Sequence, residues 1–194
     1  MIGKMRSLLK LWLYRISAWR FSRKPGIEIG DGTIVWLNSC ISTNYSGGGG
    51  IRIGNNCRIG IRKRQYWAGY VGPTRLILWG RDALITIGDG CCLNGVNICA
   101  RKLVSIGNDC IFAGGIQILD SDTHKVVTPD RKTDLDIPAS VVLGNNVWVG
   151  LNVIILKGTT IGDNSVVGAG AVVKGIFPAN CVIAGNPAKI VKRF

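Results

Sequence analysis

The chain has 194 residues, of which 27 are glycine, and its formal net charge is +13. This length is typical of one domain that buries a sizeable core without disulfides, and the 47% of apolar residues exclude a disordered chain. Glycine is about twice its usual ~7%, but only six prolines are present and no three-residue glycine period exists, which excludes collagen. His124 is the only histidine, so a site needing two or three histidines from one chain is excluded.

The cysteines indicate neither a zinc ribbon nor a redox motif, because they are seven in number and form no C-x-x-C pair. We expect them to be small buried side chains in a reducing compartment. They are Cys40, Cys57, Cys91, Cys92, Cys99, Cys110 and Cys181.

Residues 1–26 form a separate basic segment, whose first 24 residues hold seven Lys or Arg and no Asp or Glu. The spacing of Leu8, Leu9, Trp12, Ile16 and Trp19 predicts an amphipathic helix that Pro25-Gly26 ends. Lys10 and Arg15 interrupt the apolar run, which excludes a transmembrane span and a signal peptide. The helix lies on an anionic membrane surface or packs against the following domain or a neighbouring subunit. Because no nucleic-acid recognition motif follows, we expect no nucleic-acid partner.

The remainder is organised by a period of six residues. From Leu143 six consecutive hexads each begin with an aliphatic residue: Leu143, Val149, Ile155, Ile161, Val167 and Val173. The same frame occurs earlier at Ile29, Val35, Ile41, Ile53, Ile59, Ile87, Leu93, Cys99, Ile106, Phe112 and Ile118. Six residues fit a short strand plus a tight corner, and three such faces close a triangular coil. The leading residues should fill the core, and the glycines should occupy corners where φ is positive.

The period breaks at three places. Residues 61–84 form either an extra coil with degenerate corners or a loop, and Ser46 to Gly50 form a corner or short excursion. Residues 119–142 form a polar loop that contains His124, and loops on a rigid scaffold often carry function. This loop also contains the carboxylates of Asp120, Asp122, Asp130, Asp134 and Asp136.

The sequence DSDTH, followed by this loop and by IGDNSVVGAGAVVKGIFPANCVIAGNPAKIV, resembles the hexapeptide-repeat acetyltransferases of the maltose, galactoside and polysaccharide O-acetyltransferase group. The resemblance implies an all-β fold, a left-handed parallel β-helix over residues 27–188, with a basic C-terminal tail at 189–194. It also implies a homotrimer with sites between neighbouring subunits.

In this group the loop histidine is the general base, and His124 matches it. An imidazole, whose ordinary pKa is about 6.5, can take the proton of a hydroxyl as that hydroxyl attacks the thioester of acetyl-CoA. Asp120 or Asp122 would orient the imidazole or bind the acceptor, and Asp134 or Asp136 would do so from the far end of the loop. Each can instead be a solvated carboxylate. Upstream, Asn94 and Asn97 lie near the family's acceptor-binding Asn.

The resemblance also places the coenzyme along the C-terminal coils. Trp148 matches a tryptophan beside the pantetheine arm, although an exposed corner aromatic is the alternative. The remaining matches are small residues that admit the cofactor and cations that hold its phosphates: Gly150, Ala169, Lys174, Lys189 and Lys192. The alternative for the two small residues is that they only satisfy corner geometry, and the alternative for the lysines is that they form a basic tail. Lys174-Gly175 replaces the family's Thr-Lys, and we expect no metal.

These features predict an acetyl-CoA-dependent O-acetyltransferase that modifies a saccharide or lipid-linked glycan during surface polysaccharide assembly. We expect it in the cytoplasm, at the inner face of the membrane. An N-acetyltransferase acting on a nucleotide-linked amino sugar and a non-catalytic β-helical scaffold are the alternatives. A zinc carbonic anhydrase would need three histidines and is excluded.

Overall fold

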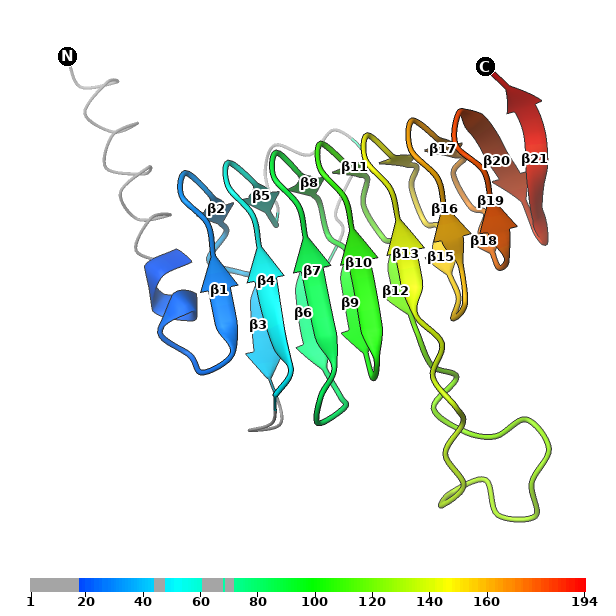
Figure 1. Ribbon diagram of the computed structural model, residues 1–194, viewed down its shortest axis with the longest axis horizontal. Coiled ribbons are helices and arrows are strands. Elements are labelled where there is room, and N and C mark those ends of the chain that lie inside the picture. The colour runs from blue at the N-terminus through cyan, green and yellow to red at the C-terminus, as the bar shows by residue number, and fades with distance from the viewer. Residues whose placement is uncertain (1–17, 44–47, 61–67, 69–71) are drawn as a thin grey trace.

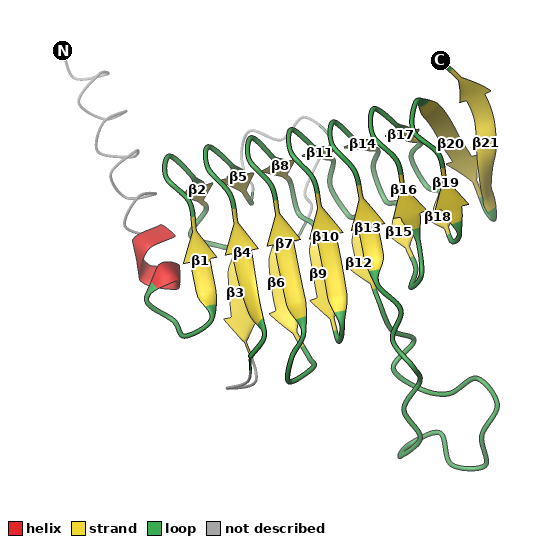
Figure 2. Ribbon diagram, viewed as in Figure 1, coloured by secondary structure: helices red, strands yellow, loops and turns green. Residues whose placement is uncertain are grey.

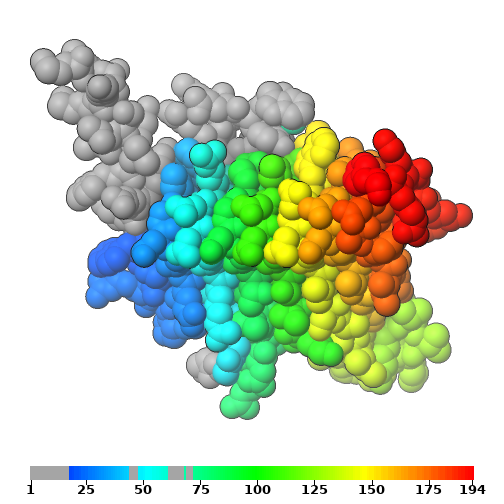
Figure 3. All heavy atoms as spheres, turned by 45° about the horizontal axis from the view of Figure 1, so that its top comes forward, coloured from blue at the N-terminus to red at the C-terminus, as the bar shows by residue number. Residues whose placement is uncertain are grey.

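The computed structural model describes residues 18–43, 48–60, 68 and 72–194. Over these residues the chain winds into a solenoid, in which a full coil supplies one short strand to each of three parallel sheets (Figures 1 and 2). The coils stack in sequence order along the long axis, as the colour bands of Figure 3 show. The period-six prediction of a solenoid is therefore confirmed.

The strands of the three sheets, which we name A, B and C, are as follows. Sheet A contains β1 (Ile27–Ile29), β4 (Gly50–Ile53), β7 (Leu84–Ile87), β10 (Leu103–Ile106), β13 (Val141–Leu143), β16 (Thr160–Ile161) and β19 (Ile176–Phe177). Sheet B contains β2 (Ile34–Val35), β5 (Arg58–Ile59), β8 (Cys92–Leu93), β11 (Ile111–Phe112), β14 (Trp148–Val149), β17 (Val166–Val167), β20 (Cys181–Gly185) and β21 (Ala188–Arg193). Sheet C contains β3 (Cys40–Thr43), β6 (Arg75–Leu78), β9 (Asn97–Ala100), β12 (Gln117–Leu119), β15 (Ile154–Ile155) and β18 (Val172–Val173).

The leading residues of the hexads fill the core. All six leaders from Leu143 to Val173 are buried, and the residues four positions after them, such as Val153 and Ser165, are buried beside them. Cys99 is an error in the predicted frame. The corner between Leu93 and Ile98 is one residue shorter than the hexad requires, so Ile98 enters the core and Cys99 turns outward. A shift of one residue in the position of a strand moves each of its side chains to the opposite face of the sheet.

The segments outside the regular coils can be compared with the sequence predictions one by one. Residues 18–22 are helical, whereas residues 1–17 of the predicted helix lie outside the described residues. Of the segment 61–84, residues 61–67 and 69–71 also lie outside them, but β6 shows that its second part completes a coil. Residues 189–194, expected as a tail, mostly belong to β21, which pairs antiparallel with β20. Within the described residues, no helix combines the length and hydropathy needed to cross a membrane.

The expectation that the cysteines are buried holds for four of the seven, and all seven thiols are free. Cys57, Cys91 and Cys110 are buried at corners, Cys181 is buried at the start of β20, and Cys57 donates its S–H to the Gly88 carbonyl at 3.1 Å. The hydrogen bond with Cys91 and, to a smaller extent, burial raise the pKa of the Cys57 thiol. Cys92 and Cys99 are half-buried and Cys40 is exposed, because these three occupy outward-facing strand positions.

Glycine is required at the corner between sheets A and B by close contact rather than by positive φ. Each such glycine lies against the backbone of the next coil, and a Cβ on Gly107 would lie 2.6 Å from the carbonyl carbon of Gly144. The side-chain oxygen of the following Asn or Asp accepts the equivalent backbone N–H of the preceding coil, as Asn145 does from Asn108 at 2.8 Å. Positive φ occurs two residues after the glycine, at Asn146 for example.

We predict that Gly107→Ala lowers the free energy of unfolding by about 1–3 kcal/mol, because its Cβ would overlap backbone atoms that cannot move without separating two coils. Gly72→Ala is the matched control, since a Cβ there meets no atom of the described residues within 4 Å. Urea unfolding followed by circular dichroism measures both. Equal midpoints for the two variants would show that close contact between coils does not explain the glycine.

Candidate active site

The predicted loop is the largest departure from the coil stack among the described residues. It leaves β12 after Leu119, returns to β13 at Val141 and projects from the edge between sheets C and A (Figure 1). The ladder continues past it without a shift, since Val104 of β10 pairs with Val141 of β13. The loop therefore has a rigid base on both sides.

Asp120 fixes the point at which the loop begins. Its carboxylate is fully buried and accepts three backbone N–H groups of the preceding coil, from Arg101 at 2.8 Å, Lys102 at 2.7 Å and Leu103 at 2.8 Å. Its backbone carbonyl accepts the N–H of Ala139 on the returning strand at 2.8 Å. Asp120 therefore joins the two ends of the loop to the coil beneath them.

An ion-pair network, which we call the loop neck, closes the base of the loop. It consists of Arg101, Ser121, Asp122, Asp136 and Lys157. One oxygen of Asp136 accepts from Arg101 at 2.7 Å and Ser121 at 2.6 Å. Its other oxygen accepts from Lys157 at 2.7 Å and from the N–H of Asp122 at 2.8 Å. Lys157 also pairs with the Asp122 carboxylate at 2.7 Å. Two aspartates of the loop are thus held by cations from two different coils.

The charges of the neck stabilise one another. Burial acts to raise the pKa of Asp136, but the hydrogen bonds from Lys157, Ser121 and the Asp122 backbone outweigh it and lower that pKa to about 2. Hydrogen bonds to Asp122 and Asp136 raise the pKa of the Lys157 ammonium. The pairs therefore remain charged across the neutral range.

His124 follows the neck directly and faces solvent. Thr123 before it has a φ of 67°, an uncommon value for a β-branched residue. Its N–H donates to the Ser121 hydroxyl at 2.9 Å, and its own hydroxyl donates to the Asp122 carbonyl at 2.6 Å. Within the described part of the chain, His124 forms no hydrogen bond or ion pair, and the carboxylates of Asp120 and Asp122 are engaged elsewhere.

The predicted coenzyme residues other than Lys174 lie along sheet B and its corners, whereas Lys174 lies at the corner between sheets C and A. Trp148 is on the outer face of β14 with 55% of its surface exposed, beside Ile111 and Val166 of the adjacent strands. Gly150 and Ala169 are stacked, because a Cβ on Gly150 would lie 2.7 Å from the Ala169 nitrogen. Lys174 after β18 is exposed, as are Lys189 and Lys192 of β21.

The structure does not bring His124 and Trp148 together within one chain, although Lys174 lies at the same edge of the β-helix as the loop. The loop leaves from the edge between sheets C and A, whereas Trp148 lies on sheet B, which is the face opposite that edge. Asn94 follows β8 and donates to the Phe112 carbonyl at 3.1 Å, and Asn97 on sheet C donates to Gln117 at 2.7 Å. Asp134, by contrast, lies within the loop and pairs with Lys125 at 3.8 Å.

Two residues of the neck, Arg101 and Lys157, are missed by sequence reasoning. Each lies at a corner between sheets C and A, where a long cation is usually a solvated charge. The available signal is that Asp120, Asp122 and Asp136 have no cation within two residues of them in the sequence. Their partners must therefore come from other coils, which a single sequence does not identify.

The loop neck predicts how the stability of the chain depends on pH. Because the pKa of Asp136 is about 2 when folded and about 3.9 when unfolded, its stabilising contribution is present above about pH 4 and is lost as the pH falls toward 2. We predict that Asp136→Asn lowers the free energy of unfolding by about 2–3 kcal/mol near pH 7 and by less near pH 3.

Urea unfolding at the two pH values tests this prediction. Asp109→Asn is the control, because Asp109 is exposed and has a φ of 56°, which asparagine adopts readily. It should change stability little at either pH. A gap between Asp136→Asn and the unaltered chain that stays constant with pH would contradict the prediction.

Comparison with known proteins places this geometry in context. Residues 140–175 match the family described as bacterial transferase hexapeptide (six repeats). The chain is 39% identical over 129 residues to WbbJ of Escherichia coli (strain K12), named as a lipopolysaccharide biosynthesis O-acetyl transferase, covering 62% of this chain and 65% of WbbJ. It is 39% identical over 89 residues to the galactoside O-acetyltransferase of the same strain, covering 46% of this chain and 43% of that enzyme. The chain thus spans less than two thirds of each of these relatives.

The fold has a solved counterpart. A mutant of AntD, an N-acyltransferase from Bacillus cereus solved with dTDP-4-amino-4,6-dideoxyglucose and coenzyme A, superposes with a TM-score of 0.65 at 19% identity. The match covers 88% of this chain and 86% of AntD. The left-handed parallel β-helix predicted from the sequence is confirmed. The chain therefore carries the hexapeptide repeat of bacterial transferases, and its relatives are acetyltransferases.

Proposed function

We propose that the chain is an acetyl-CoA-dependent O-acetyltransferase that acts on a saccharide hydroxyl in surface polysaccharide assembly, with His124 as the general base. One observation carries the proposal. The only histidine of the chain stands on a loop whose base is held to the β-helix by Asp120 and by the loop neck. The similarity to O-acetyltransferases supports the choice of reaction.

The chemistry requires a base and a thioester donor. The imidazole of His124 takes the proton of the acceptor hydroxyl as the oxygen attacks the thioester carbonyl of acetyl-CoA. The tetrahedral intermediate then expels the coenzyme A thiolate, which receives that proton, and the acetyl ester is released. Transfer is direct, so no acetylated side chain forms. Trp148, Gly150, Ala169 and the lysines 174, 189 and 192 would hold the coenzyme.

We infer that the site forms between two subunits of a trimer. Within one chain His124 and Trp148 lie on opposite sides of the β-helix, so a base and a coenzyme held in this way meet only across a subunit contact. Exposed apolar side chains of the loop support such a contact, since Val127 is 90% exposed and Ile137 is 84% exposed. On sheet B, Ile111 beside Trp148 is also exposed. Apolar patches of this kind commonly mark interfaces.

The loop neck has a positioning role in this proposal. Lys157 belongs to the same coil as Trp148, and its ammonium bonds both Asp122 and Asp136. It therefore ties the entry and exit of the loop to the coil that carries one wall of the coenzyme site. None of these groups needs to touch the substrate to hold His124 in place.

The identity of the acceptor distinguishes the proposed O-acetyltransferase from the alternative, an N-acetyltransferase acting on a nucleotide-linked amino sugar. The two relatives in sequence are named as O-acetyl transferases, which favours a hydroxyl over the amine of a nucleotide-linked sugar. A panel of saccharides and of nucleotide-linked amino sugars, followed by release of the coenzyme A thiol, identifies the acceptor class. Turnover with amino sugars alone would contradict O-acetyl transfer.

We predict that His124→Ala lowers kcat for acetyl transfer by about 10²- to 10⁴-fold, the usual contribution of a general base. Lys132→Ala in the same loop is the matched control, because its exposed side chain forms no hydrogen bond or ion pair to the described residues. It should retain activity, and both variants should unfold at the same temperature as the unaltered chain. Acetyl transfer that survives His124→Ala would show that the base lies elsewhere.

We also predict that two inactive variants complement each other. Trp148→Ala should raise KM for acetyl-CoA, so at low acetyl-CoA both it and His124→Ala are nearly inactive. Unfolding and refolding an equal mixture should restore about one quarter of the activity, the share of interfaces that receive one intact copy of each residue in a trimer. If no activity returns although mixed trimers form, both residues act within one subunit.

A further inference from the structure

The short helix at residues 18–22 docks on the β-helix through one side only. Ala18 and Phe21, three residues apart, pack against the hydrophobic core, whereas Trp19 between them is 58% exposed. Residues three apart share a face of a helix. The side that faces the first coil is therefore the side of Ala18 and Phe21.

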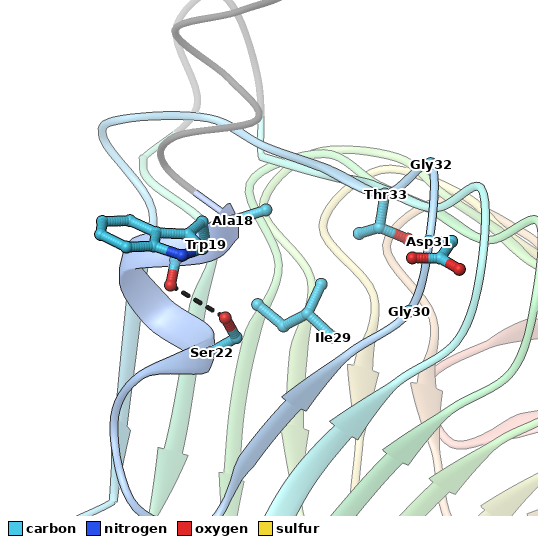
Figure 4. Close-up of a pocket in the computed structure, with 8 residues that line it drawn as sticks. All are labelled: Ala18, Trp19, Ser22, Ile29, Gly30, Asp31, Gly32 and Thr33. Atoms are coloured by element: carbon cyan, nitrogen blue, oxygen red, sulfur yellow. Dashed lines mark hydrogen bonds between the residues drawn. The ribbon is translucent and has the colours of Figure 1, made fainter.

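The surroundings of Trp19 are the edge of a pocket and a cation. A small pocket of about 190 Å³ lies between the helix and the first coil, and Trp19 lines it together with Ile29 and Thr33. In Figure 4 the indole of Trp19 extends to the side away from Ile29. The guanidinium of Arg23 lies 4.7 Å from the ring centre of Trp19, so an aromatic ring and a cation are exposed together.

The direction of Trp19 bears on the two surroundings that the sequence leaves open for the helix. Trp19 is the last member of the predicted apolar stripe, whose other members lie outside the described residues. Ala18 and Phe21 form the side that packs on the chain's own β-helix, so the exposed Trp19 takes no part in that contact and is available to another apolar partner.

The charge of the segment indicates what that partner is. The first 24 residues carry seven cations and no anion, and Arg20 and Arg23 are exposed on the described part. A stripe of Leu and Trp bordered by Lys and Arg fits a bilayer surface, where the indole lies among headgroups and cations pair with anionic lipids.

We propose that residues 18–24 hold the N-terminal end of the β-helix on a membrane surface that contains anionic lipid. Ala18 and Phe21 join the helix rigidly to the first coil, and Trp19, Arg20 and Arg23 contact the lipid. The catalytic loop lies several coils away, so the chain stands on the membrane by its end.

Flotation of the full chain with vesicles tests the proposal. The chain should float with vesicles of phosphatidylcholine mixed with phosphatidylglycerol, remain below with phosphatidylcholine alone, and be released by high salt. Arg20→Gln combined with Arg23→Gln should weaken partitioning at least about tenfold, since each cation near the surface contributes ~1 kcal/mol. Arg58→Gln combined with Arg75→Gln is the control, because both side chains are exposed elsewhere on the chain.

Trp19→Ala should also weaken partitioning, whereas Trp79→Ala, which alters another exposed tryptophan, should not. Equal binding to neutral and anionic vesicles, or equal losses in the two tryptophan variants, would overturn the proposal. So would a change in the mass of the assembly on Trp19→Ala without lipid, because the stripe would then pack on another subunit. Acetyl transfer to a soluble acceptor should be unchanged in every variant, so this test is independent of the proposed reaction.

Discussion

The close approach of successive coils is the constraint on which the rest of this structure depends. Parallel strands lie about 4.8 Å apart, and at the corners the backbone of one coil meets the side chain of the next. The corner glycines leave room for that contact, and the following Asn or Asp accepts a backbone N–H of the preceding coil. The sequence repeats because each coil must reproduce the corner geometry that the neighbouring coil requires.

The same spacing explains how a stack of short strands holds the loop of residues 119–142. Asp120 satisfies three N–H groups at the corner of one coil, while Lys157 reaches the loop from the coil on the other side. The loop is therefore held by contacts with both neighbouring coils and not only by its two ends. Buried pairs of this kind are costly to form without full hydrogen bonding, and here the carboxylate of Asp136 is fully satisfied.

The hexads from Leu143 onward predict the core correctly because six residues contain both the alternation of a strand and a corner. Cys99 is misplaced because one corner is a residue shorter, which nothing in the local pattern marks. The need for glycine was correctly identified, but its cause at Gly107 is a contact with the next coil, which no local argument contains. Arg101 and Lys157 were missed for the same reason, because their partners lie at least 19 residues away in the chain. Sequence reasoning therefore describes each coil well and the contacts between coils poorly.

The uninterrupted register across the loop has a consequence for how such a protein can change. Strands β10 and β13 pair as though the intervening residues were absent. The pairing of the coils therefore does not depend on the length or composition of the loop beyond the neck. Residues between Thr123 and Asp136 can be replaced while the coils keep their stability. Under the proposed function, acceptor selectivity and coenzyme affinity are separable properties of one chain, the first carried by an exchangeable loop and the second by the periodic scaffold.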